Sequence, residues 1–280
     1  MGIIKKLPFR GSSRAVLYIL LVLYAIITLF PFFISIIASF KDLHGLYANA
    51  LALPQVWHWE NYRIAWIQGN FSVYFRNSVY VTVLSVIGVL VFGSTASYVL
   101  ARYGFPGRTA LYMYFMAGLV IPFRLAVLPM FVLLRSLHLF DTLGGLILVY
   151  IAVDLSFAIF ILTSYFRSIP QEVEEAAVMD GAGPFRIYLQ IMLPLVRPAL
   201  ATVGIVVFVW VWNDFFIPLV FLQTSEKYTL VLGLFRFFGQ HLNEWQYVLA
   251  GANITLLPVI LLYLFASGQF IEGLTAGVRK

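Results

Sequence analysis

SIPQEVEEAAVMDGAGPFRIYLQIMLPLVRPAL, residues 168–200, is the stretch on which the interpretation of this chain depends. Ser168 and Gln171 have the spacing of a capping box, which predicts the start of a helix just after Ser168. Gly181 ends that helix, and Pro184 can begin a second one. The stretch therefore predicts two short helices joined by a tight turn.

The first of these helices is expected to present a narrow face of small side chains. Val173, Ala176, Ala177 and Asp180 follow the i, i+3, i+4, i+7 spacing of a single helix face. Its first turn is acidic, which the helix macrodipole favours, and the residues are Glu172, Glu174 and Glu175. Strongly apolar segments flank the stretch on both sides. We therefore expect the unit to lie at a membrane surface, where a partner protein can approach the alanine face closely.

The composition is that of a polytopic membrane protein. Of 280 residues, 62% are hydrophobic and only 11% are charged, whereas a soluble chain of this size needs more charge to cover its surface. The chain has no cysteine, which excludes disulfides, thiolate metal sites and cysteine nucleophiles. The net charge of +6 comes from Lys and Arg beside apolar segments, not from a basic stripe interleaved with aromatics. Nucleic acid is therefore not an expected partner, whereas membrane lipid is.

Six apolar segments are long enough to cross a bilayer as helices. They lie at about 15–40, 77–100, 111–134, 143–165, 199–222 and 247–270. Gly88 and Gly93 in the second segment suit close helix packing in lipid. No linker or separate soluble domain interrupts residues 1–280. The prediction is an all-α membrane protein with one six-helix domain, in which the loop at 168–198 connects helices four and five.

The distribution of Lys and Arg predicts the orientation of these segments. With the N-terminus in the cytoplasm, 11 of the 18 Lys and Arg residues fall in cytoplasmic segments and six in external ones, while Arg124 lies within the membrane. Positive charge favours the cytoplasmic side. Both termini and the 168–200 stretch are then cytoplasmic. The Trp-rich connection at 41–71 is external, as either an interfacial aromatic belt or a docking surface for a binding protein.

A fixed set of residue types in the 168–200 stretch carries a family resemblance. Glu175-Ala176-Ala177, three residues, Gly181, nine residues, Ile191, one residue and Leu193-Pro194 follow one another in that order. This pattern resembles the EAA loop of ABC importer permeases. Further similarity extends over nearly the whole chain, and the chain most resembles maltose-permease-like sugar importers. The residues that carry this similarity are Asn61-Tyr62, Asn77-Ser78, Trp212-Asn213-Asp214 and the tail at 270–280.

The resemblance implies how the loop works. In this family the loop seats in a cleft of a separate ATP-hydrolysing subunit and passes the motion of that subunit into the membrane. The residues expected to act in this coupling are Glu174, Glu175, Ala176, Ala177, Asp180, Gly181, Ile191 and Pro194. The implied protein is a permease subunit that forms half of the translocation pathway of a binding-protein-dependent carbohydrate importer, in a bacterial-type cytoplasmic (inner) membrane.

The same resemblance implies several partners. They are a second permease subunit in a heterodimer, two ATP-binding subunits, an external solute-binding protein and a sugar or oligosaccharide substrate. ATP and Mg would be bound by the ATPase partners, and no cofactor is expected in this chain.

Polar side chains inside the predicted spans are candidates for the substrate pathway. A charge in a membrane helix costs about 3 kcal/mol on insertion scales, so Arg124, Asp154 and Asp214 each need a partner or a water-filled cavity. One alternative is that Arg124 forms an ion pair with an aspartate. Further candidates can hydrogen-bond a sugar or offer a flat face, or else hold helices together: Trp210, Trp212 and Asn213. An arginine at 124 also leaves open an anionic sugar or sugar phosphate as the substrate.

The sequence offers no catalytic constellation. No lysine follows a glycine, so the chain cannot carry a phosphate-binding P-loop. The four histidines have no metal-ligand spacing, and no Gly-x-Ser-x-Gly motif occurs. We therefore expect a transporter subunit without a catalytic or metal site. Two alternatives remain: an ion-coupled secondary transporter, which requires an ion site and usually repeated halves, and a membrane-embedded scaffold or enzyme.

Overall fold

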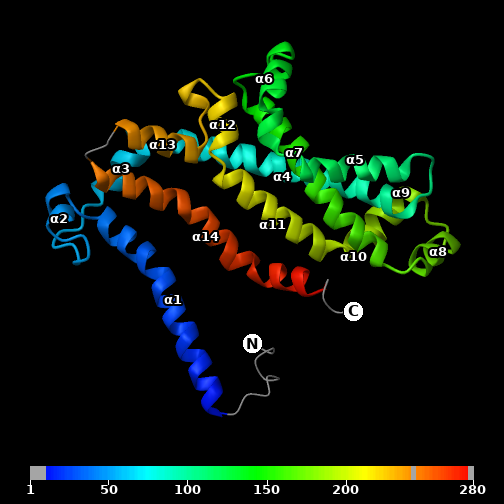
Figure 1. The fold of residues 1–280 in the computed structure, drawn as a ribbon, viewed down its shortest axis with the longest axis horizontal. Coiled ribbons are helices and arrows are strands. Elements are labelled where there is room, and N and C mark those ends of the chain that lie inside the picture. Colours follow the sequence, from blue (N-terminus) through cyan, green and yellow to red (C-terminus); the bar gives the residue numbers. More distant parts are fainter. Residues whose placement is uncertain (1–10, 241–243, 277–280) are drawn as a thin grey trace. The chain divides into compact units, whose positions relative to one another are not determined.

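The computed structural model describes residues 11–240 and 244–276, and every regular element in this part of the chain is a helix (Figure 1). Several basic residues that the orientation prediction counts lie outside the described residues, namely Lys5, Lys6, Arg10, Arg279 and Lys280. The last four positions of the predicted family tail lie outside them as well.

Four helices are long and apolar enough to cross a membrane. They are α1 (Gly11–Ser39), α4 (Phe71–Arg102), α7 (Leu143–Ser168) and α14 (Trp245–Ala276). Two bent helix pairs raise the number of possible spans among the described residues to six. The prediction of an all-α membrane protein is confirmed. The count of six spans stays a prediction, because it requires each bent pair to act as one span.

The first bent pair interrupts the apolar segment predicted at 111–134. The helix α5 (Arg108–Val120) is followed by a short turn η2 (Phe123–Ala126) and by α6 (Val127–Ser136), and the chain bends by 98° at the break. Ile121 ends α5 with an extended backbone because it precedes Pro122, and the residue before a proline disfavours the α conformation.

The second bent pair changes the segment predicted at 199–222. The helix α11 (Arg197–Asn213) ends at Asn213 and forms its bent pair, at 74°, with the helical stretch Pro184–Leu195 on its N-terminal side. At its other end, after Asn213, α11 is separated from α12 (Phe216–Phe221) by a break at Asp214 and Phe215. The helix α12 begins where the Asp214 carboxylate accepts hydrogen bonds from the backbone N–H groups of Phe216 and Ile217. The carboxylate satisfies amides that a new helix leaves unpaired, which stabilises the interruption.

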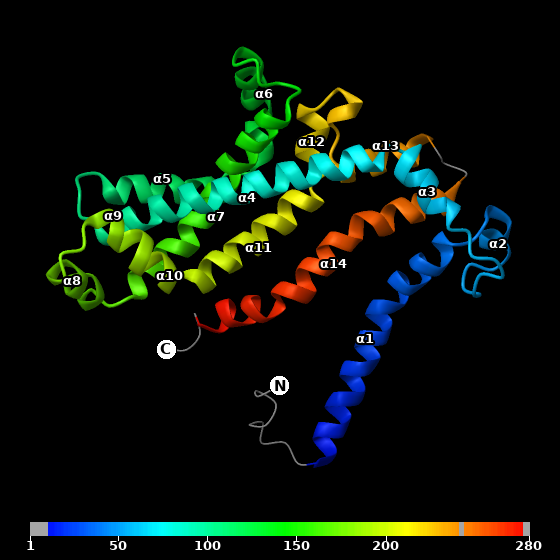
Figure 2. The ribbon, with the colours of Figure 1, turned by 180° about the vertical axis from the view of Figure 1, so that it is seen from behind.

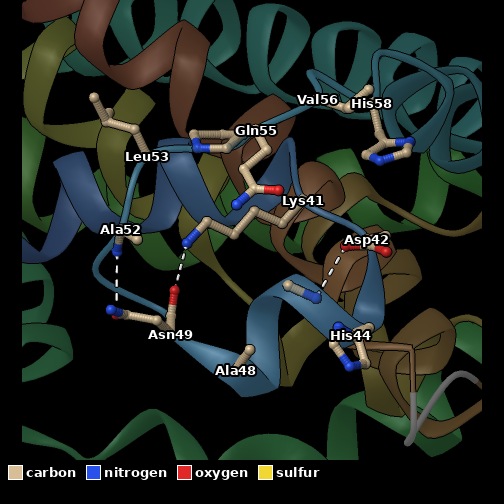
Figure 3. A pocket seen from close by; sticks show the side chains of 12 residues that line it. Lys41, Asp42, His44, Ala48, Asn49, Ala52, Leu53, Gln55, Val56 and His58 are labelled. Atoms are coloured by element: carbon tan, nitrogen blue, oxygen red, sulfur yellow. Dashed lines mark hydrogen bonds between the residues drawn. The ribbon is translucent and has the colours of Figure 1, made fainter.

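The described residues divide into two compact units, of which the first contains the chain up to Gly69 and residues 237–254. In this unit the connection after α1 folds over Lys41, which is only 4% exposed. Its Nζ donates to the carbonyl oxygen of Asn49 (Figure 3) and also to that of Ala50. Asn61 Nδ2 donates to the carbonyls of Ser39 and Lys41 at 2.8 Å. These bonds give the Trp-rich connection a defined structure around α2 (Leu43–Ala48) and α3 (Glu60–Ile67).

The second unit contains Asn70–Arg236 and the chain from Thr255 onward. Its α4 and α7 lie side by side in both views (Figure 1, Figure 2). A Cβ added to Gly93 would lie 2.8 Å from Ala158 Cβ, and one added to Gly88 would lie 2.3 Å from Ile151 Cδ1. The predicted close packing at Gly88 and Gly93 is therefore present. The rest of this unit includes η4 (Ser225–Lys227) and the start of α13 (Leu230–Gln240).

Candidate functional site

The loop between α7 and α11 contains the two short helices that the sequence predicts. The first, α8 (Glu172–Met179), begins later than expected, and the predicted capping box is wrong. Ser168 is the last residue of α7, and its Oγ donates to the carbonyl of Tyr165 at 2.8 Å, so it cannot cap α8. Gln171 precedes α8 without a side-chain cap bond.

Gly181 makes the turn between the two helices. Its φ of +79° lies in the left-handed region that favours glycine, and its N–H donates to the Val178 carbonyl at 2.9 Å. The second helical stretch then runs through α9 (Pro184–Arg186), the π-helical turn η3 (Ile187–Met192) and α10 (Leu193–Leu195). In that turn the Leu193 N–H reaches back five residues to the Tyr188 carbonyl.

Arg102, the last residue of α4, holds the first half of this loop. Its Nε lies 2.9 Å from Glu174 Oε1, and its Nη2 donates to the Ile169 carbonyl at 2.8 Å. The Arg102 side chain is 6% exposed and that of Glu174 is 21% exposed. Loss of one partner of a buried ion pair leaves the other charge uncompensated, so the pair strongly favours this position of α8. The sequence alone does not predict this role. There, Arg102 is only one of the 11 Lys and Arg residues that the predicted orientation places in the cytoplasm.

Tyr188 holds the second half of the loop against the same helix. Its hydroxyl lies 2.8 Å from Ser94 Oγ and 3.2 Å from Thr95 Oγ1, both on α4. Its ring centroid is 5.1 Å from that of Tyr98, one turn farther along α4. The end of α4 therefore contacts both halves of the loop, and nothing in the spacing of these residues signals it.

The predicted coupling residues divide into exposed and buried ones. Ala177 is buried at 6% exposure, whereas the other residues of the proposed alanine face point outward or are only partly covered. The helix α8 has only eight residues, so its contacts with the neighbouring helices, and not a long apolar stripe of its own, determine which of its sides is buried. The exposed members of the coupling set are Glu175, Ala176, Asp180 and Gly181, and the partly buried ones are Glu174, Ile191 and Pro194.

Large apolar side chains also point outward from this loop. Met179 is 86% exposed and Phe185 is 74% exposed. A cavity of about 700 Å³ lies between α8 and the end of α4, and Arg102, Glu174 and Glu175 are among its lining residues. Exposed apolar groups beside a carboxylate-bearing helix suit a protein partner.

A second cavity, of about 630 Å³, brings together most of the predicted pathway residues. They are Arg124, Asp154, Trp210, Asn213 and Asp214, and they come from η2, α7 and the α11–α12 break. The carboxylate of Asp214 accepts from the Tyr150 hydroxyl at 2.9 Å as well as from the two amides of α12. Its charge is thus matched by donors from the protein itself.

Arg124 and Asp154 remain open toward this cavity. The proposed ion pair between Arg124 and an aspartate is absent among the described residues, and the guanidinium carbon of Arg124 instead lies 5.4 Å from the Phe216 ring centroid. Asp154 is 7% exposed, and no described residue gives its carboxylate a hydrogen bond or an ion pair. A cation and a carboxylate facing a common cavity can bind a polar ligand.

The two tryptophans of the pathway prediction lie in different environments. Trp210 is 48% exposed and lines the cavity, and its ring centroid lies 4.8 Å from that of Phe157. Trp212 is 2% exposed and donates from Nε1 to the Thr255 carbonyl at 3.1 Å. Trp212 holds helices together and does not line the cavity.

Long apolar helices, a largely apolar cavity that contains Arg124, Asp154 and Asp214, and an exposed helix–turn–helix loop are together typical of a membrane transport subunit. Residues 90–269 match the family described as binding-protein-dependent transport system inner membrane component. The chain belongs to this family.

Curated relatives and a solved structure give the same class. The chain is 39% identical over 251 residues to the diacetylchitobiose uptake system permease protein NgcG of Streptomyces coelicolor, covering 89% of this chain and 83% of the relative. It is 33% identical to the probable starch degradation products transport system permease protein AmyC of Thermoanaerobacterium thermosulfurigenes, covering 89% and 91%.

The solved structure is that of a bacterial ABC transporter involved in the import of the acidic polysaccharide alginate. It superposes with a TM-score of 0.80 at 26% identity, covering 94% of this chain and 99% of that one. The protein is therefore a permease subunit of a binding-protein-dependent ABC importer, a transport component rather than an enzyme. This conclusion excludes the secondary-transporter and scaffold alternatives.

Proposed function

We propose that the exposed edge of α8 and the turn after it form the contact through which a separate ATPase subunit drives transport. The observation that carries the proposal is the outward placement of Glu175, Ala176, Asp180 and Gly181, on a loop that Arg102 and Tyr188 hold firmly against α4. A loop held in this way can receive a displacement without being deformed itself. Met179 and Phe185 supply apolar contact area beside the carboxylates.

The same proposal includes the cavity and the remaining partners. The cavity that Arg124, Asp154, Trp210, Asn213 and Asp214 line is this subunit's half of the substrate pathway. A second permease subunit completes the pathway, two ATPase subunits bind ATP and Mg, and an external solute-binding protein delivers the sugar. Closure of the ATPase pair displaces the loop and alternates access to the cavity through rigid-body motion of the helices. The α8 loop and both termini are cytoplasmic in this arrangement.

A pull-down from detergent-solubilised membranes tests the coupling contact. Glu175→Lys reverses the charge of an exposed α8 residue, so we expect it to lose the ATPase subunit while it retains the second permease. Glu226→Lys makes the same charge change on an exposed residue of the α12–α13 connection and serves as the matched control, which should retain both partners. Recovery of the ATPase with the Glu175 variant, at the intact level, would refute the contact.

A further inference from the structure

Helix α4 is an unbroken path across the second unit. It runs for 32 residues from Phe71 to Arg102 without an internal proline, which corresponds to about 48 Å at 1.5 Å per residue. Two other paths from the loop side are interrupted, at Pro122 between α5 and α6 and at Asp214 between α11 and α12, while α7 is continuous but shorter, with 26 residues. A continuous helix transmits a displacement along its axis better than a bent one.

One end of α4 is fixed through side chains to the loop at 168–198, which contains α8 and is called the coupling loop below. Arg102 pairs with Glu174 and also donates to the carbonyl that precedes α8, while Ser94 and Thr95 meet the Tyr188 hydroxyl. Because these bonds involve both helices of the loop, the loop and this end of α4 are expected to move as one body.

The opposite end of α4 is fixed to a segment far away in the sequence, residues 226–233. Asn77, which is 5% exposed, donates from Nδ2 to the carbonyls of Glu226 and Tyr228 at 2.8 and 3.0 Å. Ser78 Oγ accepts the Leu230 N–H at 2.7 Å. A Cβ added to Gly233 would lie 2.1 Å from Tyr74 Cδ2, so the backbone of this segment also lies directly against the helix.

We propose that α4 carries displacement of the coupling loop to residues 226–233, with Arg102 and Asn77 as the positioning residues at its two ends. This inference rests on the coupling role proposed above. It places residues 226–233 on the external side, where they shift when the ATPase subunits close. Conversely, a binding protein that docks on the external side favours the closed ATPase pair through the same helix, since coupling between two sites is reciprocal in binding free energy. ATP hydrolysis by the closed pair then reports this coupling.

The test uses the complete transporter in lipid vesicles with its solute-binding protein. The measurement is ATP hydrolysis with and without the binding protein, together with sugar uptake. Asn77→Leu, at the end of α4 away from the loop, should keep the ATPase subunit and basal hydrolysis. Asn77→Leu and Arg102→Gln should each lower the stimulation of hydrolysis by the binding protein, compared at equal amounts of bound ATPase subunit, by about tenfold or more. Arg102→Lys keeps the positive charge but lacks the planar guanidinium group with its several N–H donors. This variant should retain part of the stimulation.

Arg108→Gln is the matched control at the same end of α4. Arg108 donates to the Leu100 and Ala101 carbonyls of α4, yet no bond joins it to the coupling loop among the described contacts. Stimulation should therefore survive this change. Full stimulation in the Arg102 and Asn77 variants would overturn the inference, and so would an equal loss in the Arg108 variant.

Loss of the ATPase subunit in Asn77→Leu would also overturn it, because Asn77 lies at the end of α4 away from the loop and should not affect docking. Failure of the coupling proposal itself is a different result: the ATPase would stay bound in Glu175→Lys whatever happens at α4.

Discussion

At the scale of single residues, Asp141 connects two segments that are far apart in the sequence. It lies before α7 with a φ of +54°, an uncommon conformation for a residue other than glycine. Its carboxylate accepts the N–H groups of Gln223 and Thr224 as well as the Thr224 hydroxyl, and it pairs with Lys227. These contacts fix the connection after α12 to the start of α7. Burial alone would raise the pKa of Asp141, but the hydrogen bonds from Lys227, Thr224 and the two amides outweigh it and hold the pKa well below the ordinary value.

This lowered pKa makes stability depend on pH. A carboxyl whose pKa is lower in the folded state stabilises the protein above the unfolded pKa of about 3.9, and this contribution is lost as the pH falls through the folded value. Asp141→Asn should therefore lower the thermal unfolding midpoint of the solubilised transporter at about pH 7, and the difference from the unmodified chain should shrink toward about pH 3. Glu226→Gln, which removes an exposed carboxylate of the same connection, is the control. An equal difference at both pH values would contradict the assignment.

Arg124 illustrates a residue whose role stays a prediction. Its guanidinium lies over Phe216 and makes no ion pair with a described carboxylate, so a positive charge faces the cavity. This arrangement is consistent with an anionic sugar as substrate, but Asp154 presents the opposite charge to the same cavity.

At the scale of elements, the contact between α4 and α7 depends on glycine. The two helices approach so closely that a methyl group on Gly93 would meet the methyl group of Ala158, which has no rotamer by which to move away. In lipid, such close approach replaces the hydrophobic effect as the source of helix association. Since α4 connects the coupling loop with residues 226–233, its packing against α7 also determines how stiff the whole path is.

Gly93→Ala should separate α4 from α7. We expect overpacking to lower the unfolding free energy by about 1–3 kcal/mol, measured as a lower thermal midpoint in detergent. Gly144→Ala is the matched control, since a Cβ at this exposed position of α7 would have no atom within 4 Å. It should leave the midpoint unchanged or raise it slightly, because alanine favours a helix over glycine. A Gly93 variant as stable as the Gly144 variant would show that the helices adjust freely.

At the scale of the whole molecule, the orientation in the membrane decides which end of α4 would meet the proposed ATPase subunit. The chain has no natural cysteine, so single introduced cysteines report their accessibility without background. Ser225→Cys, in the connection before α13, should react with a membrane-impermeant maleimide in intact cells. Gly104→Cys, in the exposed connection between α4 and α5, should react only after the membrane is opened. The reverse pattern would invert the topology and, with it, the coupling assignment.

Local sequence patterns were sufficient to predict the class of the protein. Span length and hydropathy are local properties, and they predicted α1, α4, α7 and α14 closely. Fixed residue spacing likewise predicted the loop of two short helices around Gly181 and the family resemblance. Such features are readable because each depends on neighbours within a few turns of helix.

Which side chains meet became clear from the packing of the helices. It paired Arg102 with Glu174, buried Ala177 and Trp212, and used Asp214 to begin α12. It also left Asp154 without a described partner beside the cavity. These outcomes depend on how helices distant in sequence pack, because a side chain's burial and its hydrogen bonds are set by whatever group lies across the contact. No local pattern carries that information.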